Sequence, residues 1–423
     1  MKNKNAVLKI LAELCRLLIG VVFIFSGFVK AVDPVGGAIK IGEYLASFGL
    51  DMLQPFTVLL SFNLSAIEFA LGVCMLLGVY RRYVSFLILI FMAFMTPLTL
   101  YLALFDPVSD CGCFGDALVI SNWETFFKNI VLSLAAIVTF IYNQRLFQCF
   151  TFRAYWFVAL YAYLFGVGFA YYNYNHLPVI DFRPYKIGAN IPKLMEMPEE
   201  APQDEYKYTF VYEKDGVKKE FSLEDYPAND SSWTFVDSKT ELVKKGYQPP
   251  VAAFNIYNGK GDDVTEEIIG NPGPVLLLVA PKLEEDDEQM DEINGVYDYA
   301  LEHDIPFYCV TGSSPEAIDT WSDNTGAEYP FRMADEVLLK TIIRSNPGLV
   351  LLKGGTILGK WHYNDIPAEE EVKAVMDRCL DESNIKSKED GTLATNLLTF
   401  TVPLLLVWMY DLLRFRRKRK EKK

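Results

Sequence analysis

Two cysteines separated by a single glycine are the residues of this sequence best suited to redox chemistry. They lie in the stretch Asp110-Cys111-Gly112-Cys113-Phe114-Gly115-Asp116, and they form the only closely spaced pair among seven cysteines. A disulfide between Cys111 and Cys113 would close a very small ring, and glycine at the middle position allows the tight turn. Such a strained bond is easily reduced, which suits a carrier of oxidising equivalents. The alternatives are a static disulfide, or two idle thiols that tighten a loop.

The residues that flank the pair act on thiol acidity in opposite directions. Ser121 and Glu124 form a predicted capping box, and the positive end of the helix that begins there favours a nearby thiolate. Asp110 and Asp116 oppose this effect, because negative neighbours raise the pKa of a thiol. None of the three histidines is close in sequence, so we predict no metal site here.

Long apolar runs on both sides of the cysteine pair predict membrane-spanning helices. The chain has 423 residues, of which 51% are hydrophobic, so it is too long and too apolar for one soluble domain. A helix that crosses a bilayer needs roughly 20 mostly apolar residues. Six runs meet this length, over residues 10–29, 57–79, 83–105, 123–142, 154–172 and 394–413. Because no small-residue cleavage site stands out, we expect the first run to be an uncleaved anchor.

The basic residues near the ends of these runs predict an orientation in the membrane. They gather on one side, at Lys2, Lys4, Lys9, Arg81, Arg82, Arg145, Arg153 and residues 414–423. By the positive-inside rule, both termini are cytoplasmic in the inner membrane, and the cysteine loop and residues 173–393 share the outer, periplasmic face. Lys30 and Lys40 are exceptions to the pattern. The net charge of −14 argues against nucleic acid as a partner, whereas membrane lipids are an expected one.

Two ionisable residues, Arg16 and Glu68, lie inside predicted spans. A charge at such depth costs a few kcal/mol or more unless it is paired or hydrated. With a rise of about 1.5 Å per residue, the two residues fall at comparable depths in antiparallel helices, which predicts an Arg16–Glu68 pair. The pair could act as a proton relay or headgroup site, or it could fix helix register as a structural ion pair.

Two other segments carry apolar patterns that have more than one interpretation. Residues 39–48 predict a short helix that lies along the membrane surface, or an ordinary loop helix. The span at 154–172 is unusually aromatic, and its rings favour helix packing over stacking of a quinone or lipid.

The N-terminal third of the chain resembles a group of small four-helix membrane proteins. The matching pieces are Arg16-x-x-x-Gly20-x-x-Phe23-x-x-Ser26-Gly27-x-x-Lys30, Glu68-x-x-x-Gly72 and Cys111-Gly112-Cys113-Phe114-Gly115. With these pieces, residues 10–142 look like the DoxX/MauE group, and the cysteine loop is most like the MauE branch. MauE is associated with maturation of methylamine dehydrogenase, a disulfide-rich enzyme, and DoxX with quinone-linked oxidation. The resemblance therefore implies envelope thiol or quinol redox chemistry, although nothing in this chain points to methylamine.

The segment after the fifth span predicts a linker, a small β-sheet and an α/β domain. Residues 176–202 are rich in proline and read as a linker, and alternation around Gly216 predicts a hairpin with a further strand at 233–237. We expect later strands at 275–280, 307–311, 348–352 and 357–363, and helices at 286–302, 315–324 and 369–381. This alternation predicts an α/β or α+β sandwich.

The order of these elements resembles the thioredoxin fold, especially its peroxiredoxin and TlpA-like branch. Residues 246–261 look like its entry hairpin, and residues 345–361 look like the segment with the cis-proline. The resemblance gives Pro347 the role of shaping a substrate groove. The chain departs from the pattern after the strand at 275–280, where Pro281-Lys-Leu-Glu-Glu-Asp-Asp replaces a Cys-x-x-Cys. We therefore expect a docking module without redox activity of its own. Cys309 is either a buried free thiol or the partner of Cys379 in a disulfide.

The predicted architecture is a membrane α-helical bundle with an outer-face, thioredoxin-like α/β domain. Its parts are a four-helix DoxX/MauE-like domain (1–150), a fifth span (151–175), a linker with a β-rich segment (176–245), the thioredoxin-like domain (246–386), a sixth span (392–413) and a basic tail (414–423).

Two functional hypotheses follow from this architecture. In the first, Cys111 and Cys113 are the redox pair of a thiol–disulfide oxidoreductase that acts on an outer-face thiol protein and passes electrons to a membrane quinone. In the second, the chain is a non-enzymatic, membrane-tethered assembly factor or chaperone, as the missing Cys-x-x-Cys suggests. The sequence identifies neither the client, the residues that bind a cofactor, nor the oligomeric state.

Overall fold

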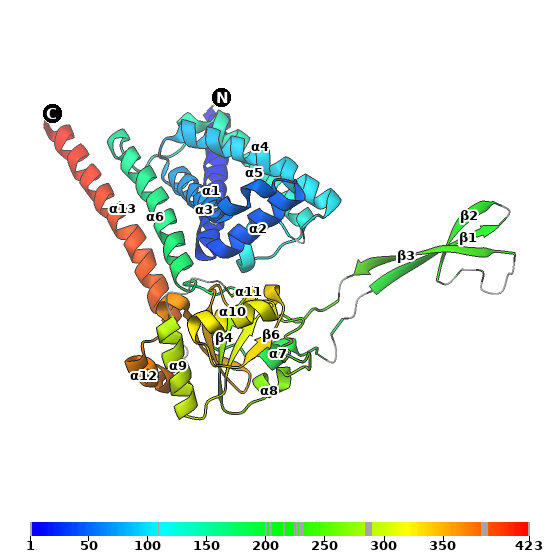
Figure 1. Cartoon of the computed structure of the whole chain (residues 1–423). Helices are drawn as coiled ribbons and strands as arrows, with labels where there is room; N and C mark the ends of the chain where they lie inside the picture. The colour runs from blue at the N-terminus through cyan, green and yellow to red at the C-terminus, as the bar shows by residue number, and fades with distance from the viewer. Residues whose placement is uncertain are drawn as a thin grey trace.

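The computed structural model has three parts: a helical bundle, a domain built on a five-stranded sheet, and a protruding three-stranded sheet (Figure 1). It describes residues 2–108, 110–198, 201–202, 205–214, 216–223, 225, 227, 232–244, 246–283, 290–381 and 388–421. The sheet domain lies at one end of the bundle, and both ends of the chain lie at the other end (Figure 1).

In the part of the chain that the structure describes, the bundle contains six long α-helices and one short α-helix. The long helices are α1 (Lys2–Val32), α3 (Thr57–Leu77), α4 (Arg81–Phe105), α5 (Asn122–Ile141), α6 (Tyr155–Asn175) and α13 (Lys388–Glu421), and the short one is α2 (Pro34–Ser47). Among the described residues, five segments are long and apolar enough to cross a membrane: 51–77, 81–105, 122–141, 152–175 and 393–414. They correspond to five of the six predicted spans. The remaining predicted span, at 10–29, is the first along the chain and lies within the 31-residue helix α1.

Helices α1 and α3 pack closely because glycines stand where their backbones meet. A Cβ atom added to Gly27 would lie 2.4 Å from the backbone nitrogen of Phe69, and one added to Gly72 would lie 2.5 Å from that of Ile24. Small residues of this kind let membrane helices approach closely. The contact fixes the antiparallel register of α1 and α3.

Helix α13 joins the bundle through the aromatic face of α6. The rings of Phe165 and Phe400 lie 4.7 Å apart between centroids, and the Tyr161 hydroxyl donates to the carbonyl of Thr399 at 2.6 Å. At the end of the bundle where the chain termini lie, the backbone nitrogen and the hydroxyl of Thr151 both donate hydrogen bonds to the carboxylate of Asp411. The aromatic residues of this span therefore serve helix packing.

The second domain is a mixed sheet in the order β6-β5-β4-β7-β8, covered by helices on both faces. The strands are β4 (Pro274–Ala280), β5 (Phe307–Thr311), β6 (Phe331–Met333), β7 (Gly348–Lys353) and β8 (Thr356–His362). Strands β4, β5 and β6 are parallel, whereas β7 and β8 are antiparallel to their neighbours. Helices α9 (Met290–Glu302), α10 (Pro315–Thr325) and α12 (Glu369–Leu380) cover one face, and α7 (Ile191–Met195), α8 (Thr265–Ile269) and α11 (Glu336–Ile342) cover the other.

The strands and helices predicted after residue 275 are confirmed, with two additions. Strand β6 and helix α11 were not predicted, and the start of the helix expected at 286–302 lies outside the described residues. The predicted linker at 176–202 is instead packed against the sheet. Tyr185 and Ile191 are buried there, and the Gly188 nitrogen donates to the Ile357 carbonyl at 2.7 Å. The linker prediction was wrong because single buried residues attach this segment to the sheet. Such residues leave no periodic apolar pattern in the sequence.

The three-stranded sheet consists of β1 (Glu205–Lys214), β2 (Val217–Ser222) and β3 (Thr234–Lys244), in the order β2-β1-β3. It protrudes from the body of the protein (Figure 1). Strands β1 and β2 form the predicted hairpin, and Gly216 in its turn has a φ of +77°. Glycine adopts this left-handed conformation without strain.

Candidate functional site

The Cys111–Cys113 loop follows α4 at the end of the bundle that faces the sheet domain. The two sulfur atoms lie 2.8 Å apart, and both side chains are buried. Gly112 between them has a φ of +62°, so glycine is required at this position. Asp110 supports the turn by accepting a hydrogen bond from the Gly112 nitrogen at 2.8 Å. The structure therefore holds two thiols side by side in a shielded turn.

Two helices of the bundle hold the backbone of this loop. The Tyr44 hydroxyl of α2 donates to the Cys111 carbonyl at 2.6 Å, and the Ser26 hydroxyl of α1 lies 2.8 Å from the Cys113 carbonyl. Lys40, also on α2, forms an ion pair with Asp110 at 3.1 Å. Contacts from α1 and α2 thus fix the positions of both cysteines.

A buried polar cluster lies directly beside Cys113. Lys30 Nζ is 2.7 Å from Glu68 Oε1, and Ser26 Oγ is 2.7 Å from Glu68 Oε2. Glu68 is only 2% exposed. The Lys128 ammonium of α5 lies on the other side of the loop, 4.0 Å from the ring centroid of Phe114. Charged groups therefore surround the cysteine loop from within the bundle.

The predicted Arg16–Glu68 pair is not formed. Arg16 instead pairs with Glu13 at 2.6 Å and donates to the carbonyl groups of Met75 and Leu76, near the opposite end of α3. The glycine contacts between α1 and α3 set a register in which Lys30 faces Glu68. Arg16 lies fourteen residues earlier, about 21 Å along the helix at 1.5 Å per residue. The prediction compared the depths of Arg16 and Glu68 from the ends of the predicted spans. Those ends do not determine how far α1 is shifted along α3.

The two thiols differ in acidity. The hydrogen bond from the Cys111 thiol lowers the pKa of Cys113 to about 6, and the positive charges of Lys128 and Lys30 act in the same direction against the effect of burial. The pKa of Cys111 is raised, first by its hydrogen bond with Cys113 and then by burial. A thiolate is the reactive form of cysteine. Cys113 is therefore the better nucleophile of the pair.

A cavity of about 490 Å³ lies between the bundle and the sheet domain, and both cysteines line it. Its apolar wall includes Phe91, Phe94 and Met95 of α4, whereas Val337 and Lys340 on the facing wall belong to α11. Binding sites for small molecules have similar volumes and a similar mixture of apolar walls and few polar groups. The cavity gives a ligand of this size access to the thiols.

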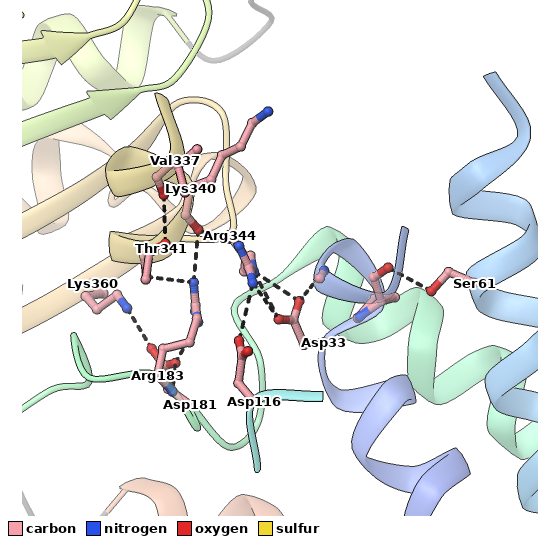
Figure 2. Close-up of polar contacts among 12 residues, drawn as sticks. Asp33, Ser61, Asp116, Asp181, Arg183, Val337, Lys340, Thr341, Arg344 and Lys360 are labelled. Carbon is pink, nitrogen blue, oxygen red and sulfur yellow. Dashed lines mark hydrogen bonds and ion pairs between the residues drawn. The ribbon is translucent and has the colours of Figure 1, made fainter. Parts of the chain in front are cut away.

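Arg344, just after α11, connects the two domains at the edge of this cavity (Figure 2). Its Nη2 atom lies 2.9 Å from Asp33 Oδ2 and 3.4 Å from Asp116 Oδ2. Burial and the nearby charge of Asp33 raise the pKa of Asp116, while Arg344 opposes this shift. Asp116 lies three residues after Cys113, so Arg344 connects the sheet domain to the cysteine loop itself.

A second buried charge cluster lies on the sheet-domain side of Arg344 (Figure 2). Asp181 pairs with Lys360 at 2.7 Å and with Arg183 at 2.9 Å. Burial lowers the pKa of Lys360 to about 8, although Asp181 opposes this shift. Arg183 also donates to the carbonyl of Thr341 at 3.1 Å, at the end of α11. The cluster thereby fixes α11 and the adjacent Arg344 on strand β8.

Pro347 begins the segment that leads into β7, and the Asn346–Pro347 bond is cis. The Lys282 nitrogen donates to the Asn346 side chain at 3.2 Å. The segment where the sequence lacks a Cys-x-x-Cys therefore lies next to Pro347. Cys309 is fully buried as a free thiol, and burial raises its pKa. The alternative of a disulfide with Cys379 is not realised.

Several residues around the cysteine pair were not among the predicted site residues. Lys30 had two signals in the sequence, because it belongs to the first-helix motif and departs from the positive-inside pattern. No signal in the sequence marked the other residues of the site, which are Tyr44, Lys128, Asp33 and Arg344. The Asp33–Arg344 pair joins residues 311 positions apart, and only the docking of the two domains brings them together.

Comparison with known proteins gives two family matches and no related protein or structure. Residues 206–245, the protruding sheet, match a domain of unknown function, DUF8463. Residues 8–142, roughly a third of the chain, match the family of methylamine utilisation protein MauE. No curated protein and no solved structure matches the chain. Together with the apolar helices, the second match shows that the chain is a multi-pass, MauE-like membrane protein.

Proposed function

We propose that this protein is a membrane-bound thiol–disulfide oxidoreductase whose redox pair is Cys111 and Cys113. The observation that carries the proposal is the placement of two adjacent thiols in the wall of the interdomain cavity, with one of them acidified. Burial alone would keep both thiols protonated. The hydrogen bond between them and the nearby ammonium groups instead favour one thiolate, which is the arrangement that disulfide exchange requires.

The proposed cycle has two balanced steps. In the first, a client dithiol reduces the Cys111–Cys113 disulfide: the client gains a disulfide, and its two hydrogens and two electrons pass to the cysteine pair. In the second, the reduced pair transfers two electrons and two protons to a membrane quinone, which leaves as a quinol while the pair returns to the disulfide. The apolar wall of the cavity, with Phe91 and Phe94, suits a lipid-soluble acceptor.

The sheet domain is proposed to be a thioredoxin-like docking module. The order of its strands and the position of Pro347 support this assignment, as does the resemblance of the sequence around residues 345–361. The segment after β4 carries no cysteine, so the module would position a client without exchanging electrons. In this proposal Pro347 shapes the client groove, and the cavity wall formed by α11 guides the client thiol toward Cys113.

The proposed orientation places the cysteine loop and residues 173–393 on the periplasmic side of the inner membrane, with both termini in the cytoplasm. The positive-inside pattern supports it. The structure is compatible with it, because the loop and the sheet domain share one end of the bundle while α1 begins and α13 ends at the other (Figure 1).

Trapping of mixed disulfides in intact membranes tests the redox role. Thiol–disulfide exchange is reversible, so in the reverse of the first step the Cys113 thiolate attacks the disulfide of the oxidised client, and one client thiol leaves. Cys111 is the thiol that then resolves this mixed disulfide. A Cys111→Ser variant should therefore accumulate a client attached to Cys113, and a Cys113→Ser variant should accumulate none. Cys149→Ser is the matched control, because Cys149 is a thiol near the opposite end of the bundle. Absence of any trapped client in Cys111→Ser membranes, with normal oxidation of envelope thiols in the double variant, contradicts the proposal.

The second candidate is a non-enzymatic assembly factor, favoured by the missing Cys-x-x-Cys in the sheet domain. It predicts that the Cys111→Ser/Cys113→Ser double variant keeps its biological activity. It also predicts that substitutions near Pro347 abolish client binding in variants with an intact cysteine pair. The same trapping experiment, followed by co-purification of the client with the double variant, separates the two functions.

A further inference from the structure

A second, smaller cavity lies inside the bundle on the far side of Cys113. It has a volume of about 30 Å³ and is lined by Cys113, Ser26, Lys30, Glu68, Lys128 and Asn129, together with apolar side chains. A cavity of this size has room for a water molecule, which needs roughly 10–15 Å³ and two to four polar partners, and the polar groups of its lining can supply them. Cys113 and Lys30 line both this cavity and the larger one. Glu68 lines only the inner one.

The Ser26 hydroxyl links Glu68 to the cysteine loop through a hydrogen bond that can point either way. Its oxygen lies 2.7 Å from Glu68 Oε2 and 2.8 Å from the Cys113 carbonyl. A serine hydroxyl has one hydrogen to donate. When Glu68 is ionised, Ser26 donates to the carboxylate. When Glu68 is protonated, the carboxyl group donates to Ser26, and Ser26 donates to the Cys113 carbonyl, so both short contacts are satisfied at once.

The geometry points to a proton that Glu68 and Cys113 share across the inner cavity. In this step the Cys113 thiol loses its proton, the Glu68 carboxylate gains it, and no proton enters or leaves the cluster. This inference deepens the proposed function, on which it rests, because it gives the redox thiol its proton partner. Glu68 is a positioning residue in this scheme, since it reaches the reacting sulfur only across the inner cavity, and Ser26 connects it to the Cys113 carbonyl.

The charges around the cavity explain why sharing a proton is favourable. Lys30 on α1, Lys128 on α5 and Cys113 in the loop are the titratable groups that line the inner cavity together with Glu68, and Cys111 contacts Cys113. Removal of a thiol proton to solvent would add a second negative charge beside Glu68 in a buried region, which is costly. Transfer to Glu68 only moves one negative charge from the carboxylate to the sulfur, and Lys30 is close enough to stabilise either form.

The pH profile of Cys113 alkylation tests the shared proton. The full-length protein is reduced in membrane vesicles and treated with iodoacetamide between pH 4 and 9, and mass spectrometry of peptides measures the rate at Cys113. A shared proton makes the wild-type profile rise in two steps, because the two groups titrate together. Glutamine mimics the protonated carboxyl group permanently. Glu68→Gln should therefore give one step with its midpoint lower by about one pH unit, a tenfold change in the proton equilibrium.

Two controls separate this effect from general damage to the bundle. Glu68→Asp keeps the carboxylate and should restore the two-step profile. Glu13→Gln makes the same chemical change in the ion pair with Arg16, at the other end of α1, and should match wild type. A single-step wild-type profile, or a Glu68→Gln profile that is unchanged or moved to higher pH, overturns the inference. If Glu68→Gln does not fold, the number of steps in the wild-type alkylation profile still tests the inference.

The outcome is independent of the proposed oxidoreductase activity. Alkylation reads the Cys113 thiolate directly and needs neither a client nor a quinone. A shifted profile together with a negative trapping experiment refutes the redox function but keeps the shared proton. A trapped client together with an unchanged profile refutes only the role of Glu68.

Discussion

Arg344 of the sheet domain and Asp33 of the membrane bundle form an ion pair at 2.9 Å, at the edge of the cavity that contains Cys111 and Cys113. Asp33 lies directly before α2, and its Oδ1 atom caps that helix by accepting a hydrogen bond from Gly36 at 2.8 Å. The same carboxylate therefore anchors α2, whose Tyr44 holds the loop, and docks the sheet domain over the loop.

Breaking this pair should loosen the docking of the two domains. The Arg344 side chain is only 9% exposed, and removal of one partner from a buried ion pair costs about 3–5 kcal/mol. We expect Arg344→Gln to lower the thermal stability of the purified protein and to speed the reaction of Cys113 with a bulky maleimide. Asp33→Asn should give the same result, since asparagine still caps α2 but lacks the charge.

Two variants control this prediction. Lys340→Gln removes an exposed ion pair with Glu336 from the adjacent helix α11, which should change stability by no more than about 0.5 kcal/mol. The double reversal Asp33→Arg/Arg344→Asp restores opposite charges and should recover part of the lost stability. Equal effects of Arg344→Gln and Lys340→Gln would show that the interdomain pair does not hold the domains together.

The acidity of Cys113 should depend on the thiol of Cys111. The hydrogen bond from Cys111 is the largest cause of the lowered pKa of Cys113, which is about 6. The Cys113 thiol therefore ionises more readily than the Cys111 thiol and reacts before it. Cys111→Ala removes the donor and should slow Cys113 alkylation at pH 6 by tenfold or more, whereas Cys111→Ser keeps a hydroxyl donor and should slow it less. Equal rates in the alanine and serine variants would contradict the assignment.

Acid should destabilise the sheet domain through His362. Burial lowers the pKa of His362 to about 4, below its ordinary value of 6.5, against the charge of Asp365. The folded state therefore binds the proton less readily than the unfolded state, so stability is full above pH 6.5 and is lost as pH falls toward 4. In addition, His362 Nδ1 accepts a hydrogen bond from the Asn364 nitrogen at 3.3 Å, and a protonated imidazole has no acceptor.

Thermal melts of the full-length protein between pH 4 and 8 check this expectation. The melting temperature should fall between pH 6.5 and 4, and His362→Asn should reduce the size of that fall. His303→Asn is the matched control, because His303 is an exposed histidine in the same domain. An equal fall in the wild type and in His362→Asn would assign the acid sensitivity to other groups.

Local patterns in the sequence predicted most of the fold. The continuous apolar runs gave strands β4 and β5, and the Ser121–Glu124 capping box begins α5 as expected. Each of these signals is contained in a few consecutive residues. Helix α11 was missed because it has only seven residues and half-buried or exposed positions over most of its length.

The candidate site was predictable only in part, for a related reason. The cysteine pair and Glu68 could be selected by residue type and position alone. Their partners depend on the register of α1 against α3 and on the docking of the two domains. Because of this register, Lys30 and not Arg16 lies beside Glu68, and the docking brings Arg344 to Asp33. Hydrophobic patterns fix the face of a helix more firmly than its offset along a neighbour. An offset of several turns changes which polar residues meet without changing the apolar pattern.

The contact between α1 and α3 should therefore control the site as well as the stability of the bundle. A Cβ atom at Gly27 would lie 2.4 Å from the Phe69 nitrogen and 2.7 Å from the Ser65 carbonyl oxygen, and backbone atoms cannot move aside as a flexible side chain can. Gly27→Ala should push α1 away from α3, separate Lys30 from Glu68, and lower the melting temperature by several degrees. Without the nearby Lys30 charge, Cys113 alkylation at pH 6 should also slow. Gly168→Ala is the matched control, because a Cβ atom there meets nothing within 4 Å. A melting temperature and an alkylation rate that are the same in both alanine variants would mean that this helix contact does not position the cysteine loop.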